Sequence, residues 1–107
     1  MQLNLNKPIC FFDLETTGVS ITSDKIVEIS ILKVFVNGEE NLKTWLLNPE
    51  MKISPQATAV HGITNEKVSD QPTFKMIAKK IFNFIKDSDL GGFNSNRFDI
   101  PILAEEF

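Results

Sequence analysis

The chain has 107 residues, 11 basic and 14 acidic side chains, 42% hydrophobic residues and one cysteine, which is the composition of one soluble globular domain or part of one. No window approaches the roughly 18 consecutive apolar residues of a membrane span, and the amino terminus lacks a secretory signal, so we expect a cytoplasmic protein without a membrane partner. Cys10 alone excludes an intramolecular disulfide and a cysteine-based zinc site. The net charge of −3 excludes a nucleic-acid binder that relies on a broad basic surface.

Three strands are predicted in the first half of the chain. Lys7 to Leu14 is a short, aromatic-rich apolar run, typical of a strand that is covered on both faces. Lys25 to Val36 is rich in β-branched residues, and Asn37-Gly38 then favours a type I′ turn before a second extended segment, Glu40 to Leu47. Strand alternation is expected to put three apolar side chains on one face, those of Val27, Ile29 and Ile31. The second and third strands are therefore predicted to pair antiparallel.

The second half of the chain has mainly helical signals. Ser54 and Thr64 are predicted to cap two short helical segments. The clearest helix runs from about Thr73 to Ile85, where apolar residues recur at helical spacing: Phe74, Ile77, Ala78, Ile81, Phe82 and Ile85. Leu90 to Phe93 is predicted as a strand, and Ile100 to Phe107 as a further helix.

This order of elements predicts an α/β fold with a mixed sheet of three antiparallel strands plus one parallel strand, with helices packed on it. The last predicted helix has made about two turns when it reaches Phe107, and no capping residue follows. We therefore expect the natural protein to continue, with residues 1–107 forming the N-terminal portion of a single domain.

Two carboxylates stand at the end of the first strand. Asp13 and Glu15 are two residues apart, so strand alternation puts both side chains on one face. A hard divalent cation with oxygen ligands would neutralise them, whereas the simpler interpretation leaves them exposed at a fraying strand end. Thr16, Thr17 and Gly18, which follow, supply hydroxyls and a flexible backbone suited to close approach by a ligand.

A second polar segment, Asn94 to Asp99, follows the predicted strand Leu90 to Phe93 directly. If that strand is parallel to the first one and beside it, Asp99 falls next to Asp13 and Glu15. Alternatively, Asp99 is a first-turn helix acid favoured by the helix dipole. The two interpretations are compatible with each other.

On these residues the chain resembles the DnaQ-like 3′-5′ exonucleases, a family with four acidic residues on a ribonuclease H-like fold. The first family motif matches at Phe12-Asp13-Leu14-Glu15-Thr16-Thr17-Gly18, and the second at Asn94 to Asp99. Between them, Val60-His61-Gly62-Ile63-Thr64 is similar to the family's V-H-G-I segment.

The resemblance implies a site with two Mg²⁺ or Mn²⁺ ions. Asp13 would bridge the ions, Glu15 would bind the first ion and orient the attacking water, and Asp99 would hold the second ion. Such sites stabilise the attacking and leaving oxygens of an in-line displacement, and the product would be a nucleoside 5′-monophosphate. The residues expected to bind the terminal nucleotide are Thr16, Gly18, Val60, His61, Asn94 and Phe98.

One family feature has no match in the chain. The third motif, which supplies a general base and the fourth acid, needs a histidine or tyrosine after the second motif, but the chain has no tyrosine and its one histidine is His61. We interpret His61 mainly as a pocket or packing residue, with a catalytic base as the alternative. This chain is therefore expected to be inactive alone, while the full-length protein is a 3′-5′ exonuclease.

Two other functions remain open at this level. The chain could be a catalytically incomplete domain that only binds nucleic-acid ends or a DNA polymerase. A haloacid dehalogenase-like phosphatase is disfavoured, because Glu15 stands where that motif has an aspartate and Asn94 to Asp99 would have no role. The expected partner is a single-stranded 3′ end of DNA or RNA, and an unpaired edge at Leu90 to Phe93 would permit a homo-oligomer.

Overall fold

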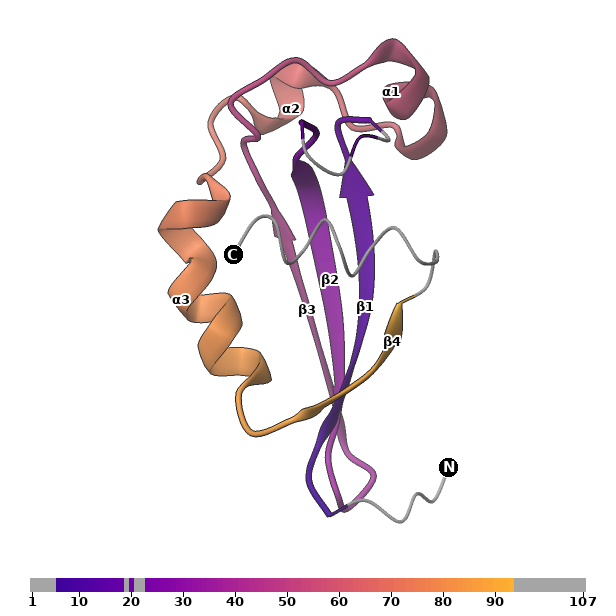
Figure 1. Cartoon of the computed structure of the whole chain (residues 1–107), viewed down its shortest axis with the longest axis vertical. Coiled ribbons are helices and arrows are strands. Elements are labelled where there is room, and N and C mark those ends of the chain that lie inside the picture. The colour runs from indigo at the N-terminus through magenta and orange to yellow at the C-terminus, as the bar shows by residue number, and fades with distance from the viewer. Residues whose placement is uncertain (1–5, 19, 21–22, 94–107) are drawn as a thin grey trace.

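The structure, a computed structural model, describes residues 6–18, 20 and 23–93. Within these ranges four strands and three helices are arranged as Figure 1 shows. In chain order they are β1 Ile9–Thr16, β2 Ile26–Val34, β3 Glu40–Leu46, α1 Pro55–His61, α2 Asn65–Val68, α3 Phe74–Ile85 and β4 Asp89–Phe93. The helix predicted at residues 100–107 lies outside the described residues.

The four strands form one mixed sheet in the order β3-β2-β1-β4. β2 pairs antiparallel with both β1 and β3, whereas β4 runs parallel to β1, as the order of elements predicted. The pairing puts Phe93, the last residue of β4, beside Phe12 of β1. The carboxyl ends of these two strands therefore lie at the same end of the sheet.

The turn between β2 and β3 differs from the prediction. A type I′ turn needs a positive φ at both Asn37 and Gly38. Gly38 has a φ of 89°, but Asn37 is not among the described non-glycine residues with a positive φ, which are Glu50 and Asp87. The Gly38 amide donates to the Phe35 carbonyl, and the Phe35 amide donates to the Glu39 carbonyl. This pattern is that of a tight turn followed by a glycine bulge, another common hairpin connection.

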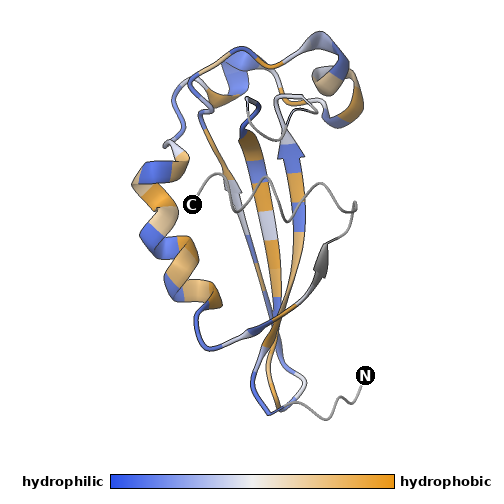
Figure 2. Ribbon diagram, in the orientation of Figure 1, coloured by the Kyte–Doolittle hydropathy of each residue, from blue (hydrophilic) through white to orange (hydrophobic). Residues whose placement is uncertain are grey.

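Side-chain polarity alternates along β1, and α3 covers its apolar face (Figure 2). Cys10, Phe12 and Leu14 are buried, whereas Phe11 is 37% exposed and Asp13 is exposed. The buried face and α3 share one core cluster, made of Cys10, Phe12, Leu14, Ile26, Ile29, Ile31, Leu47, Phe74, Ile77 and Ile81. Among the described residues α3 covers one face of β1, and these residues do not test the prediction that the other face is covered as well.

The predicted apolar stripe of α3 is correct at Phe74, Ile77 and Ile81, which are buried. Phe82 is the exception, since 54% of its surface is exposed. It lies at the margin of the stripe, one residue after Ile81, and the helix turns it away from the sheet. The predicted caps Ser54 and Thr64 each accept a hydrogen bond from the backbone three residues later, and Thr73, where the long helix was predicted to begin, does the same for α3.

A second apolar cluster joins the start of β2 to α1 and α2. Its buried members are Val27, Ile53, Ile63 and Val68. Val27 has no partner on β1, because Glu15 pairs with Glu28 and Thr16 pairs with Ile26, so the strand carries a bulge. The bulge explains why Val27 packs apart from Ile29 and Ile31, contrary to the prediction. The second apolar cluster also anchors α1 and α2 at the end of the sheet where β1 ends (Figure 1).

Candidate active site

Asp13 and Glu15 project from the face of β1 opposite α3, as strand alternation predicted. Asp13 is exposed and Glu15 is half-buried. Across the strand pair, Asp13 faces Ser30 and Glu15 faces Glu28. Directly opposed like charges are unfavourable on a sheet, so a cation near Glu15 and Glu28 would relieve their repulsion.

The remaining predicted site residues belong to the second motif. Asp99, Asn94 and Phe98 lie outside the described residues, and no group of three metal-binding side chains occurs among residues 6–18, 20 and 23–93. The parallel pairing of β4 with β1 nevertheless brings the end of β4 to Phe12, one residue before Asp13. In open sheets with parallel strands, ligands bind at the carboxyl ends of those strands.

The turn after β1 is joined to the carboxyl end of α1. The carbonyl oxygen of Thr16 lies 2.9 Å from Nε2 of His61, and the Thr16 hydroxyl donates to the Gly18 carbonyl at 2.6 Å. The structure therefore brings together three of the residues predicted to bind the terminal nucleotide, Thr16, Gly18 and His61. The link crosses 45 positions in the sequence.

Both ring nitrogens of His61 have a hydrogen-bond partner. The Ile63 amide donates to Nδ1 at 3.1 Å, so Nδ1 is the acceptor and the Nε2–H group donates to Thr16. A catalytic base needs a lone pair that faces the substrate, and this tautomer has none to spare. The geometry favours the packing and pocket role of His61 over the base.

Val60 precedes His61 and is 83% exposed, although it is apolar. It stands near the carboxyl end of α1, where Gly62 ends the helix with a φ of 74°. Val60 is thus an exposed apolar residue that directly precedes His61, the residue that bonds Thr16. No contact in the described residues gives Val60 another role in the core.

Sequence reasoning missed Asp24 and the structural role of Thr17, which together shape this turn. Thr17 is buried, with 1% of its surface exposed, and its hydroxyl donates to a carboxylate oxygen of Asp24 at 2.7 Å. Asp24 stands in a polar stretch with no periodicity, so nothing in its neighbours predicts a contact with the Thr-Thr-Gly segment. The one usable signal is Gly18, since a glycine at a strand end indicates that another group approaches its backbone closely.

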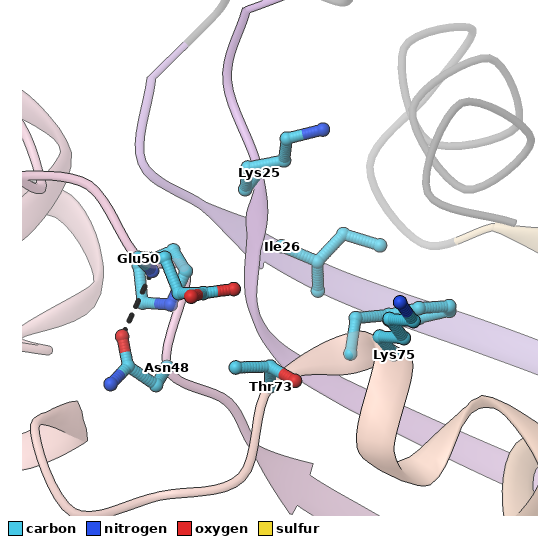
Figure 3. Close-up of a pocket in the computed structure, with 8 residues that line it drawn as sticks. Lys25, Ile26, Asn48, Glu50, Thr73 and Lys75 are labelled. Atoms are coloured by element: carbon cyan, nitrogen blue, oxygen red, sulfur yellow. Dashed lines mark hydrogen bonds between the residues drawn. The ribbon is translucent and has the colours of Figure 1, made fainter.

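A separate pocket of about 180 Å³ lies between the start of β2 and the start of α3 (Figure 3). Its lining residues are Lys25, Ile26, Asn48, Pro49, Glu50, Thr73, Phe74 and Lys75. None of the predicted site residues is among them. The Asn48 side chain accepts the Glu50 amide at 2.9 Å and Thr73 caps α3, so these two side chains hold the local backbone.

Residues 10–107 match the sequence model of the exonuclease family RNase_T. The DNA polymerase III subunit epsilon of Buchnera aphidicola is 34% identical over 112 residues, which cover 98% of this chain and 47% of that protein. The PolC-type DNA polymerase III of Caldanaerobacter subterraneus is 30% identical over 105 residues, which cover 98% of the chain and 7% of the polymerase. The chain thus spans less than half the length of these relatives.

The fold also matches that of a solved nuclease. Escherichia coli exonuclease I, in complex with a dT13 oligonucleotide, superimposes with a TM-score of 0.77 over 91% of this chain and 22% of that protein, at 18% sequence identity. At this identity the likeness establishes the fold, which is the predicted ribonuclease H-like arrangement of a mixed sheet with helices. No described helix is long and apolar enough to span a bilayer.

Proposed function

The chain belongs to the DnaQ-like exonuclease family, and from this premise we propose that residues 1–107 are the N-terminal portion of a metal-dependent 3′-5′ exonuclease domain. The proposed reaction hydrolyses the last phosphodiester of a nucleic-acid strand and releases a nucleoside 5′-monophosphate. One observation carries the proposal: Asp13 and Glu15 lie on one face of β1, at the end of the sheet where parallel β4 leads into the second motif.

Asp13 and Glu15 suit a hard divalent cation such as Mg²⁺ or Mn²⁺. Their donors are carboxylate oxygens, and Glu28 opposite Glu15 adds a third negative charge to the same region. We propose that Asp13 and Glu15 would hold the first ion and that Asp13 and Asp99 would hold the second. When bound, two such ions polarise the attacking water and stabilise the leaving 3′ oxygen.

The terminal nucleotide would lie against the turn that follows β1. Backbone groups of Thr16 and Gly18 would reach the 3′ hydroxyl, and His61 would hold the Thr16 carbonyl in place through its Nε2–H group. Exposed Val60 would contact one side of the base, with Phe98 and Asn94 of the second motif completing the pocket. Apolar contact with a base is tolerant of sequence, as an exonuclease requires.

The proposed substrate is the single-stranded 3′ end of DNA. Two relatives are DNA polymerase III proteins, and the solved nuclease of the same fold was crystallised with an oligonucleotide. These names also favour a DNA polymerase as the partner, bound or fused. Buried, unpaired Cys10 suits a reducing cytoplasm, where such a partner would operate.

The test is a nuclease assay on the full-length natural protein that contains this chain. With Mg²⁺ or Mn²⁺, a 5′-labelled single strand should shorten one nucleotide at a time from its 3′ end, and chelation should stop the reaction. Failure to release mononucleotides would overturn the proposal. Tight binding of 3′ ends without hydrolysis would instead support the alternative of a catalytically incomplete binding domain.

The edge of the sheet at β4 motivates a further proposal about assembly. In the described residues β4 pairs with β1 on one side only, and unpaired strand edges favour association with another strand. We propose that two copies of this chain, when it is isolated, associate through this edge. Sedimentation equilibrium should then give a dimer, and a strictly monomeric species would contradict the idea.

A further inference from the structure

We propose that Asp24 is a positioning residue for the nucleotide pocket: together with Thr17 it fixes the turn Thr16–Gly18 that presents the pocket's backbone groups. The inference rests on the proposed function for the role of that turn. The contacts of Asp24 themselves are independent of any reaction.

Both carboxylate oxygens of Asp24 accept short hydrogen bonds from the loop that it closes. Oδ1 accepts the Thr17 hydroxyl at 2.7 Å, and Oδ2 accepts the Ser20 amide at 2.7 Å. The Asp24 amide in turn donates to the Ser20 carbonyl at 2.9 Å. Hydrogen bonds to an ionised acceptor are stronger than neutral ones, so Asp24 fixes the loop at both Thr17 and Ser20.

Thr17 transmits this constraint to the strands. Its hydroxyl accepts the Lys25 amide at 3.0 Å, and its own amide donates to the Lys25 carbonyl at 2.9 Å. The Thr17 carbonyl accepts the Ser54 amide at 2.9 Å, which ties the turn to the start of α1. Thr17 is the only buried polar residue in the described ranges, and these bonds use both its backbone groups and its hydroxyl.

Gly18 shows how closely the Asp24 carboxylate approaches the turn. A Cβ atom added to Gly18 would lie 2.6 Å from Oδ2 and 2.9 Å from Cγ of Asp24. The described glycines with positive φ are Gly38 and Gly62, so Gly18 is required by this close approach and not by its backbone conformation. The third residue of the Thr-Thr-Gly segment is therefore glycine because Asp24 occupies the space of a side chain.

The two ends of the turn are held by different partners. His61 bonds the carbonyl of Thr16 at 2.9 Å, and Asp24 bonds Thr17 and packs against Gly18. Because both its oxygens already accept hydrogen bonds, Asp24 is poorly placed to serve as a further metal ligand. Its effect on the reaction must pass through the position of the turn.

The test compares Asp24→Asn with Asp70→Asn, an exposed aspartate whose side chain bonds the neighbouring Gln71. In the full-length protein, Asp24→Asn should raise KM for a single-stranded oligonucleotide about tenfold, the effect of losing about one hydrogen bond to an ionised group. It should change kcat less than about threefold, because the turn binds the terminal nucleotide and does not hold the ions. Asp70→Asn should change neither. Lower kcat at unchanged KM, or no change in either, would overturn the proposal.

Hydrogen exchange of the metal-free protein gives a second readout that does not depend on the reaction. The Ser20 and Lys25 amides should exchange about tenfold faster in Asp24→Asn, while those of β3 remain unchanged. Thr17→Val should raise KM and speed amide exchange as Asp24→Asn does. Thr17→Ser, which keeps the hydroxyl, should have nearly the KM and exchange rates of the wild type. Unchanged exchange would refute the proposal that Asp24 and Thr17 fix the turn. A wild-type protein without nuclease activity would instead refute the proposed function, and the exchange result would still test the role of Asp24 in the turn.

Discussion

The eight residues of β1 are divided between two faces that serve opposite purposes. Cys10, Phe12 and Leu14 are buried under α3, where they share a cluster with the adjacent strand and the helix. Asp13 and Glu15 alternate with them on the other face, opposite Ser30 and Glu28. The buried face gains stability from removing apolar surface from water, whereas the acidic face concentrates like charge. The core therefore holds in place a group of carboxylates that would not assemble without it.

A substitution on the buried face should destabilise the protein most. Phe12 is 2% exposed, and Phe12→Ala should lower the free energy of unfolding by about 3–5 kcal/mol through lost burial and a cavity. Chemical denaturation measures this change. Phe11→Ala, one residue earlier on the partly exposed face, is the matched control and should cost less than half as much. Equal losses would contradict the assignment of the two faces.

A substitution on the acidic face of β1 should lower activity and leave the stability nearly unchanged. Asp13→Asn should lower nuclease activity of the full-length protein by about 1,000-fold, since a metal site supplies several kcal/mol of transition-state stabilisation. Its unfolding free energy should stay within about 0.5 kcal/mol, as for other exposed substitutions. Ser30→Ala, the cross-strand neighbour, is the control and should retain activity. An Asp13→Asn protein that unfolds readily would show that Asp13 is a structural residue.

Divalent cations should stabilise the same face. Addition of Mg²⁺ or Mn²⁺ to the metal-free full-length protein should raise Tm, because a ligand that binds only the folded state stabilises it by mass action. At a concentration 100 times Kd the gain is about 2.7 kcal/mol. Asp13→Asn should abolish most of this shift, whereas Ser30→Ala should keep it. An equal shift in both variants would place the cations elsewhere.

A change in the edge strand β4 should affect the less buried face of β1. Gly91 has no partner on β1, because Cys10 pairs with Leu90 and Phe11 pairs with Gly92. A Cβ atom at Gly91 would lie 2.7 Å from the Phe11 ring and 2.8 Å from Ile9, so Gly91→Ala should cost about 1–3 kcal/mol of unfolding free energy. Leu90→Ala, with 57% of its surface exposed, is the control and should cost less. A neutral Gly91→Ala would mean that β4 can shift without loss.

Most of the fold could be predicted because periodicity and capping are local signals. The stripe of α3 follows from residue spacing, the caps Ser54 and Thr64 from residue type, and the parallel strand β4 from the order of elements. The bulge at Val27 was not predictable, because it depends on how β1 and β2 match in length and on where α1 and α2 attach. Likewise, the hairpin turn follows from the full strand register and not from Asn37-Gly38 alone.

The sequence predicts the acids of the candidate site but gives little sign of the residues that support them. Asp13 and Glu15 are conspicuous because two charges interrupt an apolar strand at a spacing of two. Asp24 gives no such signal, since an aspartate in a polar loop is ordinary until the fold brings it against Thr17 and Gly18. The tautomer of His61 depends in the same way on contacts with Thr16 and Ile63 that only the folded chain makes.

The smallest change in unfolding free energy should come from loss of a helix cap, and it should differ between α3 and α2. Thr73 caps the 12-residue α3 over the main core, and Thr64 caps the 4-residue α2 beside the site. Thr73→Ala should lower the unfolding free energy by about 1 kcal/mol, as loss of a cap usually does. Thr64→Ala should have a smaller global effect, because α2 contributes only Val68 to the buried surface. Denaturant midpoints of the two variants measure the difference, and a larger loss for Thr64→Ala would mean that α1 and α2, and not α3, limit the stability of the fold.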